Sequence, residues 1–345
     1  MPFISPDELQ WAQIVQANPH DMYQLPGYSR LEATALEGNP IAWVYQEKET
    51  EPVVIPLIER VIHNNGVVYK DLVSPYGYPG LVYSTSTTHA QFCTCLKSFH
   101  EEAANCNYVS SFVRLHPLYN TFQINKQSGI SQHAHGPTVS INLNLPLAEI
   151  RQSYSSNHRR NMRRLCNEGF KVSVNQWSLL PDFIKLYWQT MSRKMAKKRY
   201  FFDVAYFEGL KALLGDNLML VMVHNNQSTP AAGGLFSIVE GLAQFHLGGT
   251  AEDFVGQSPS KLMMDAAVSA CKDQGAHTLH LGGGYGSSAS DGLFRFKAGF
   301  GQQRHSFSTL RFIHRRDTYR QLMENTNLPS KNPGTYFPEY RFLGT

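Results

Sequence analysis

Residues 231–249 read AAGGLFSIVEGLAQFHLGG, and this stretch decides the fold. Two apolar runs, Ala231–Val239 and Leu242–Gly249, flank the pair Glu240-Gly241. Apolar runs on either side of a turn signal predict two antiparallel strands joined by a tight hairpin. We therefore expect a hairpin here and take it as the centre of a larger unit.

The hairpin is followed by a predicted helix and a further strand. Ser258 can cap the helix, Pro259 fits its first turn, and His277–Leu281 predicts the closing strand. An earlier part of the chain predicts the same succession of hairpin, loop, helix and strand, at residues 53–73, 74–80, 87–104 and 108–115. Two copies of one supersecondary unit indicate an α/β fold with two related domains. We expect the first domain over residues 1–145 and the second over residues 146–345, the latter with basic helices and an irregular C-terminal tail.

The positive charge of the chain is concentrated in one belt. Between Arg151 and Arg199, twelve Lys and Arg residues stand against two acidic residues, so this window carries +10 in a chain of net charge +4. The spacing predicts two helices here, over about residues 155–168 and 181–197, the first of them capped by Ser155. Such a belt is either a solvated helix face or a surface that binds phosphates. The candidates for binding RNA are Arg159, Arg160, Arg163, Arg164, Lys197 and Lys198.

Composition excludes several classes of protein. Aromatic residues make up 12% of the 345 residues and charged residues only 17%, which excludes a disordered chain. The longest apolar runs are too short for a membrane span, and the first ten residues predict no secretory signal. Five cysteines without a C-x-x-C pair indicate free thiols in a reducing cytoplasm. No histidine spacing predicts a metal site, so we expect neither a metal nor another cofactor.

Two motifs in the second half carry candidate chemistry. Leu281-Gly282-Gly283-Gly284 follows a predicted strand, and glycines there either let the backbone approach a ligand or form a tight turn. Residues 291–301 read DGLFRFKAGFG. Lys297 can hold a phosphate or offset charge on an oxyanion, or else reach out to solvent while the aromatic residues pack in the core. Asp291 can orient Lys297 or cap the turn that follows.

Several stretches resemble the Fem peptidyltransferase family in order and spacing. They comprise Tyr154–Arg164, Phe245–Gly249, Ser258-Pro259, Leu281–Gly284 and Asp291–Phe300. The loop Ser74–Gly80 is similar to the first-domain loop of the FemAB-like and FemX-like members, and the resemblance covers about residues 20–310. The chain lacks room for the long helical arm that some members insert in their second domain.

The resemblance implies a fold and an activity. The fold is α/β, with two tandem GNAT-like domains whose mixed central sheets are flanked by helices. The activity is transfer of an amino acid from aminoacyl-tRNA to an amine acceptor, a peptidoglycan precursor or another small peptide-linked or nucleotide-linked amine. Phe296 and Lys297 match the family pair associated with the tRNA 3′ end and the transition state, and Arg193 and Arg199 match family arginines that contact the phosphates of the acceptor. The resemblance and the loop positions make substrate-binding candidates of Tyr76, Tyr78, Arg193, Arg199, His246, Gly283, Gly284 and Phe296.

Two other functions remain open at the level of sequence. An acyl-CoA-dependent N-acyltransferase would need a glycine-rich Q/R-x-x-G-x-G/A loop before a helix, and neither Ser74–Gly80 nor Asp253–Ser260 fits that pattern. A non-catalytic RNA-binding module could be built on the basic belt alone. His246 lies in a predicted buried strand, where a hydrogen-bonded core histidine is the commoner outcome.

Overall fold

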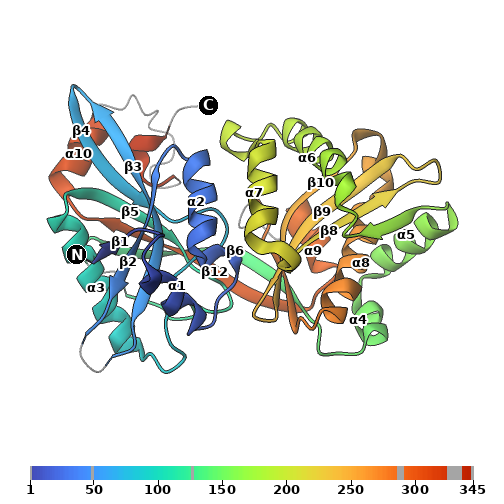
Figure 1. Cartoon of the computed structure of the whole chain (residues 1–345), viewed down its shortest axis with the longest axis horizontal. Coiled ribbons are helices and arrows are strands. Elements are labelled where there is room, and N and C mark those ends of the chain that lie inside the picture. Colours follow the sequence, from blue (N-terminus) through green and yellow to red (C-terminus); the bar gives the residue numbers. More distant parts are fainter. Residues whose placement is uncertain (1, 48–49, 126–127, 286–290, 325–335, 343–345) are drawn as a thin grey trace. The chain divides into compact units, whose positions relative to one another are not determined.

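The computed structural model describes residues 2–47, 50–125, 128–285, 291–324 and 336–342 (Figure 1). The chain divides into two compact units, one formed by residues 1–135 together with 307–345, the other by residues 136–306. The predicted division at residues 145 and 146 therefore differs from the observed one, because the C-terminal segment belongs to the first unit. Strands β6 (Ile130–Asn142) and β12 (Gln303–Ile313) each run from one unit into the other.

The second unit is built on a mixed sheet. Its strands lie in the order β6-β11-β10-β9-β8-β7, and all neighbours are antiparallel except β10 and β11. The strands are β7 (Lys171–Val174), β8 (Leu218–His224), β9 (Pro230–Val239), β10 (Leu242–Thr250), β11 (Thr278–Gly282) and the last part of β6, from residue 136 onward. The predicted hairpin is confirmed: Glu240 and Gly241 both have positive φ, as a tight hairpin turn requires.

Helices cover both faces of this sheet. They are α4 (Leu147–Ser153), α5 (Ser156–Asn167), α6 (Leu180–Arg193), α7 (Val204–Leu214), α8 (Ser260–Asp273) and α9 (Gly292–Ala298). Met219, Val221 and Val223 of β8 share a core with α8, whereas Phe183 of α6 reaches the opposite face at Gly233. Gly249 has no room for a side chain, since a Cβ there would lie 2.5 Å from the backbone of Leu186 in α6. Helix α6 therefore packs directly on β10.

The first unit repeats the pairing of hairpin and crossover. Strands β3 and β4 form an antiparallel hairpin, helix α3 follows, and β5 returns parallel to β4, as α8 and β11 do after β9 and β10. The elements are β1 (Phe3–Ile4), β2 (Asn39–Tyr45), β3 (Val53–Asn64), β4 (Val67–Val73), β5 (Tyr108–Arg114), α1 (Leu9–Gln16), α2 (Pro26–Ala35), α3 (His89–Asn105) and α10 (Arg316–Glu324). The predicted α/β class with helices around mixed sheets is confirmed.

A buried carboxylate ties the C-terminal segment to the first unit. Asp71 of β4 is fully buried and accepts two hydrogen bonds from Arg60, at 3.0 and 3.1 Å. Its oxygens also accept from Arg341, at 2.6 and 3.0 Å, and from the Tyr340 hydroxyl, at 2.9 Å. Two guanidinium groups and a phenol thus share one carboxylate, which holds residues 340 and 341 against β4.

Ser258 does not cap α8 as predicted. Pro259 occupies the N-cap position, and Ser258 is the left-handed residue that ends the short 3₁₀ helix Glu252–Gln257. In contrast, Ser155 caps α5 as predicted, since its hydroxyl accepts from the His158 N–H at 3.2 Å. The basic belt therefore begins at a well-defined helix start.

Candidate functional site

The site is formed where two parallel strands of the second unit stop pairing. Strands β10 and β11 pair over three residues each, Leu242–Gln244 of β10 and Thr278–His280 of β11. Beyond Gln244, β10 continues to Thr250 and, among the described residues, pairs only with β9. The register of β10 shifts just beyond that point, between Phe245 and Leu247. The residues that follow the last pair, on either strand, are the ones that surround Lys297.

Lys297 lies between the two parting strands. Its Nζ donates to the Gly283 carbonyl at 2.7 Å and lies 5.8 Å from the centre of the Phe245 ring. The side chain is buried, with 8% of its surface exposed, so the alternative in which it reaches into solvent does not describe this structure. An ammonium group has three donors, and within the described residues Gly283 O is the hydrogen-bond acceptor it uses.

Burial also sets the charge of Lys297. Loss of hydration lowers the pKa of Lys297 to about 8, and the nearby Asp291 carboxylate opposes that shift. The amine therefore changes charge close to neutral pH, where a small change in its surroundings alters the fraction of cation. A buried lysine with a displaced pKa next to a glycine turn is a candidate for chemistry rather than for solubility.

Asp291 builds the turn and the helix that carry Lys297. One carboxylate oxygen accepts from the backbone N–H groups of Leu293 and Phe294, at 2.8 and 3.0 Å, which caps α9. The other accepts from Tyr285 N at 2.6 Å. A Cβ on Gly284 would lie 2.7 Å from the Asp291 carboxyl carbon, so this position requires glycine. The bonds fit the capping alternative, and a catalytic role for Asp291 stays a prediction.

His158 fastens the other end of the same helix. It lies on the buried face of α5, and its Nε2 donates to the Phe296 carbonyl at 2.9 Å. Burial lowers the pKa of His158, so the ring is neutral and its single N–H is the donor to that carbonyl. The ring also fills the space beside Gly299, where a Cβ would lie 2.4 Å from it. Nothing in the sequence indicates this contact, because the partners are 138 residues apart.

We expect His158→Phe to loosen α9 while His158→Gln largely preserves it. Phenylalanine keeps the ring against Phe300 but removes the donor to Phe296, whereas the glutamine amide can reach the same carbonyl. Loosening α9 re-hydrates the Lys297 amine, so its pKa rises from about 8 toward that of an exposed lysine. Competitive acylation of Lys297 across pH, read by mass spectrometry, measures this without any substrate. Equal titration midpoints in His158→Phe and the wild type would show that His158 only fills space.

The C-terminal end of α6 brings further cations to this region. Arg193 donates to the Thr250 carbonyl at 3.2 Å, which places it at the end of β10. Lys194 Nζ lies 5.9 Å from the centre of the Tyr285 ring, the residue that follows the glycine turn. Arg199 instead stacks on the adjacent Tyr200 and donates to its hydroxyl at 2.8 Å. Of the two arginines predicted to bind phosphates, Arg193 therefore neighbours the site, together with Lys194, which the sequence did not single out.

The four arginines of α5 form an exposed basic face. Arg159, Arg160, Arg163 and Arg164 all lie at the surface of the second unit. Arg164 donates to the Gln257 carbonyl at 3.1 Å, and Arg159 donates to the Gln152 carbonyl. Their spacing keeps all four on one side of the helix, opposite the buried His158. The structure thus places the predicted RNA-binding arginines on the helix that also holds α9.

The remaining candidates are His246, Phe296, Tyr76 and Tyr78. His246 is buried in β10 beside the Tyr206 hydroxyl, at 3.0 Å, and burial lowers its pKa to about 3, which fits the core-histidine alternative. Phe296 is half-buried and packs against His158 and Phe300. Tyr76 and Tyr78 belong to the first unit, where the Tyr76 N–H donates to the buried Glu32 at 3.3 Å. Their roles in substrate binding stay predictions.

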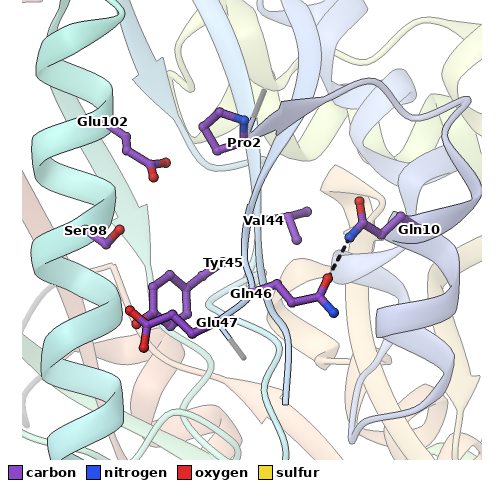
Figure 2. Close-up of a pocket in the computed structure, with 8 residues that line it drawn as sticks. All are labelled: Pro2, Gln10, Val44, Tyr45, Gln46, Glu47, Ser98 and Glu102. Atoms are coloured by element: carbon purple, nitrogen blue, oxygen red, sulfur yellow. Dashed lines mark hydrogen bonds between the residues drawn. The ribbon is translucent and has the colours of Figure 1, made fainter. Parts of the chain in front are cut away.

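A separate hollow in the first unit contains none of the predicted residues. It has a volume of about 330 Å³ and lies between α1, β2 and α3, and Figure 2 shows Glu47 and Glu102 on one side and the Gln10–Gln46 hydrogen bond on the other. Glu102 accepts from the Trp43 indole at 2.6 Å.

No group of three potential metal ligands occurs among the described residues. Over the same ranges, no helix has the length and apolar character that crossing a membrane requires.

Comparison with known proteins places this geometry in a fold family. Residues 152–298, which hold α5, the parting strands and Lys297, match the family model described as an acetyltransferase (GNAT) domain. The crystal structure of FemX superposes with a TM-score of 0.66 at 15% identity, over 93% of this chain and 99% of that one. The fold is that of the GNAT and Fem transferases. The resemblance to the Fem family expected from the motifs is confirmed at this level.

Two further solved structures share the GNAT-like fold. One is the C-terminal domain assigned to a lysylphosphatidylglycerol synthetase from Agrobacterium fabrum, with a TM-score of 0.57 at 13% identity, over 91% of this chain and 93% of that one. The other is L-PGS from Bacillus licheniformis, with a TM-score of 0.55 at 13% identity, over 90% and 94%. None of the curated proteins compared with the chain is significantly similar to it in sequence. The family match and the fold support an acyltransferase of the GNAT or Fem type.

Proposed function

We propose that this protein transfers an amino acid from aminoacyl-tRNA to an amine acceptor in the cytoplasm. The observation that carries the proposal is the buried ammonium of Lys297, held by Gly283 where β10 and β11 part. Arg193 and Lys194 add positive charge beside the same turn. A buried cation with further positive charge beside it suits a donor whose acyl ester is attached to a polyanion, as the ester of aminoacyl-tRNA is.

The reaction requires little beyond positioning and charge. The neutral amine of the acceptor attacks the ester carbonyl, a C–N bond forms, and the carbonyl oxygen becomes an oxyanion. The Lys297 ammonium stabilises that oxyanion, since a fixed cation in a dry site interacts strongly with developing charge. Collapse breaks the C–O bond to the terminal ribose, and the proton lost by the amine ends on the ribose oxygen. Asp291, with three backbone N–H donors, acts in this account through the shape of the turn.

The connection between β10 and α8 favours tRNA over CoA as the donor. An acyl-CoA enzyme would use backbone N–H groups here to hold the pyrophosphate. In this chain the N–H groups of Ser258, Lys261 and Leu262 donate to the chain's own carbonyls, at 3.0–3.2 Å, and Pro259 has none to give. The Gln257 carbonyl is also taken, by Asn161 at 2.9 Å and by Arg164. Three N–H groups at this helix start are therefore already engaged within the chain, which supports tRNA rather than CoA as the donor.

The acceptor follows from the resemblance and remains a class. For the Fem family it is an amine on a peptidoglycan precursor, and here we extend it to any small peptide-linked or nucleotide-linked amine. Arg193 and Arg199 are the proposed contacts with the phosphates of that acceptor, and Tyr76 and Tyr78 keep the substrate-binding role that the resemblance implies. Phe296 is proposed to contact the terminal adenosine of the donor, through whatever part of its half-buried ring is accessible.

Binding of charged tRNA tests the proposal through the α5 face. Arg160→Glu/Arg163→Glu is the cleanest variant, because Arg159 and Arg164 also donate to backbone carbonyls. We expect the affinity to fall, and the slope of log K against log salt to become shallower by about one per lost phosphate contact. The matched control is Lys97→Glu/Arg320→Glu, which reverses two exposed cations of the first unit. Binding that does not depend on salt, or equal losses in both variants, would contradict a tRNA surface on α5.

A further inference from the structure

The connection between α6 and α7, yellow-green in Figure 1, carries an unusual surface. Met195 is 90% exposed and sits at the tip with a positive φ of 49°. Phe201 is 38% exposed, and Trp188 and Val204 on the two helices are exposed as well. We call these four apolar residues, together with Lys194, Lys197 and Lys198, the α6–α7 patch. Single exposed apolar residues are common, but a group of large ones on one short connection marks an interaction surface.

The connection carries only positive charge as far as Asp203, which is exposed beside Val204. Five of the seven residues from Arg193 to Arg199 are Lys or Arg, and the sequence contains no acidic residue between Asp182 and Asp203. Lys194, Lys197 and Lys198 are exposed on the same connection as Met195. A partner that fits this surface must therefore carry negative charge and also offer an apolar region in which aliphatic side chains can be buried.

The fold holds the patch in place. The Tyr187 hydroxyl donates to the Tyr200 carbonyl at 2.6 Å, and the Trp188 indole donates to the Phe202 carbonyl at 2.8 Å. These two bonds fasten the connection back onto α6. The apolar side chains are thus presented outward by a fixed backbone, which lowers the entropy lost on docking.

We propose that the α6–α7 patch docks the second unit on an anionic lipid surface. Lysines attract the headgroups while Met195 and its neighbours enter the boundary between headgroups and acyl chains. RNA is the other polyanion to consider, since bases could stack on the exposed rings of Trp188 and Phe201. The most exposed side chain of the patch is the aliphatic Met195, which favours the boundary between headgroups and acyl chains. The α5 face offers the contrast, since α5 itself carries four exposed arginines and, among the described residues, no exposed large apolar side chain.

The patch borders the proposed catalytic site. Lys194 lies over the ring of Tyr285, which is 70% exposed and whose N–H is held by Asp291. Docking through the patch would bring this end of the site to the membrane surface, so that the acceptor amine is carried by a lipid. This last step rests on the proposed function, whereas the docking itself does not.

Flotation with vesicles tests the docking directly. The full chain is mixed with vesicles of phosphatidylcholine alone, or of phosphatidylcholine with one third phosphatidylglycerol. We expect binding to the anionic vesicles only, about a tenfold loss in Met195→Glu, and a loss of more than tenfold in Lys197→Glu/Lys198→Glu. Leu9→Glu, at an exposed apolar position of the first unit, is the matched control and should bind like the wild type. Thermal unfolding checks that each variant is folded.

The outcomes separate this inference from the proposed function. Arg160→Glu/Arg163→Glu should lose tRNA affinity and keep vesicle binding, and Met195→Glu should lose vesicle binding and keep tRNA affinity. Wild-type protein that stays with neither kind of vesicle at low salt would overturn the inference. So would binding that Met195→Glu leaves unchanged, which would show simple charge attraction. Loss of tRNA binding, with vesicle binding intact, in the lysine variant would assign the patch to RNA.

Discussion

Lys297→Ala is expected to lower the single-turnover rate of transfer by roughly 10²–10³ at saturating donor, the loss typical for one oxyanion-stabilising group. The fold should survive, because alanine is compatible with α9 and the bond lost is a single one to Gly283 O. The affinity for donor and acceptor should change little, since the interaction becomes strong only as the oxyanion forms. Lys297→Arg should recover little of the rate, because a planar guanidinium does not replace a compact ammonium in this buried space.

Two controls make the Lys297 result interpretable. Lys297→Met keeps the length and apolar stem of the side chain beside Phe245 and removes only the charge. If the positive charge of Lys297 is what stabilises the transition state, the Lys297→Met and Lys297→Ala variants should show the same fold-reduction in transfer rate relative to the wild type. The wild-type rate should also fall above about pH 8, because burial lowers the pKa of Lys297 to about 8 and the cation is lost above it. A folded Lys297→Ala protein that transfers at the wild-type rate would rule out this role.

Asp71→Ala is expected to lower the free energy of unfolding of the first unit by about 3 kcal/mol. Removal of one member of a buried ion pair leaves its partners without compensation, which is strongly destabilising. Here two arginines, Arg60 and Arg341, would lose their shared carboxylate, and Tyr340 would lose an acceptor. The C-terminal segment should also become accessible to protease, since Asp71 is its anchor.

Asp7→Ala provides the matched control for Asp71. Asp7 pairs with Arg30 in the same unit, but both side chains are largely exposed, so the expected loss is below about 1 kcal/mol. Chemical unfolding followed by fluorescence of the buried Trp11 and Trp43 measures both variants in the first unit. Equal stability of the two variants, or protease resistance of the C-terminal segment in Asp71→Ala, would contradict the anchoring role.

The sequence was informative wherever a local pattern determines the structure. The Glu240-Gly241 turn, the Ser155 cap and the apolar runs of β9 and β10 are short-range signals, and the structure has each of them. The predicted Ser258 cap is the exception, because Pro259 takes the N-cap position of α8. The repeated hairpin and crossover follow from the same signals. The resemblance to the Fem family was recognised from motifs whose order and spacing along the chain follow this repeated succession of hairpin, helix and strand.

Contacts between distant residues could not be predicted in the same way. Arg341 meets Asp71 across 270 positions, so the C-terminal segment was wrongly expected in the second unit. The bond from His158 to Phe296 spans 138 positions, and neither residue carries a signal for the other. The burial of Lys297 was likewise undecided, because the motif DGLFRFKAGFG fits a solvent-exposed lysine and a buried one equally well.

The central claim is that this chain takes its acyl group from tRNA. The direct measurement supplies the protein with a pool of tRNAs carrying labelled amino acids, with labelled acetyl-CoA, and with amine acceptors from a small-molecule and lipid extract. We expect label to leave the tRNA and appear on an acceptor with wild-type protein, Lys297→Ala to slow this by roughly 10²–10³, and acetyl-CoA to remain intact. Label that leaves acetyl-CoA instead, or label that leaves tRNA equally fast with Lys297→Ala, would contradict this expectation.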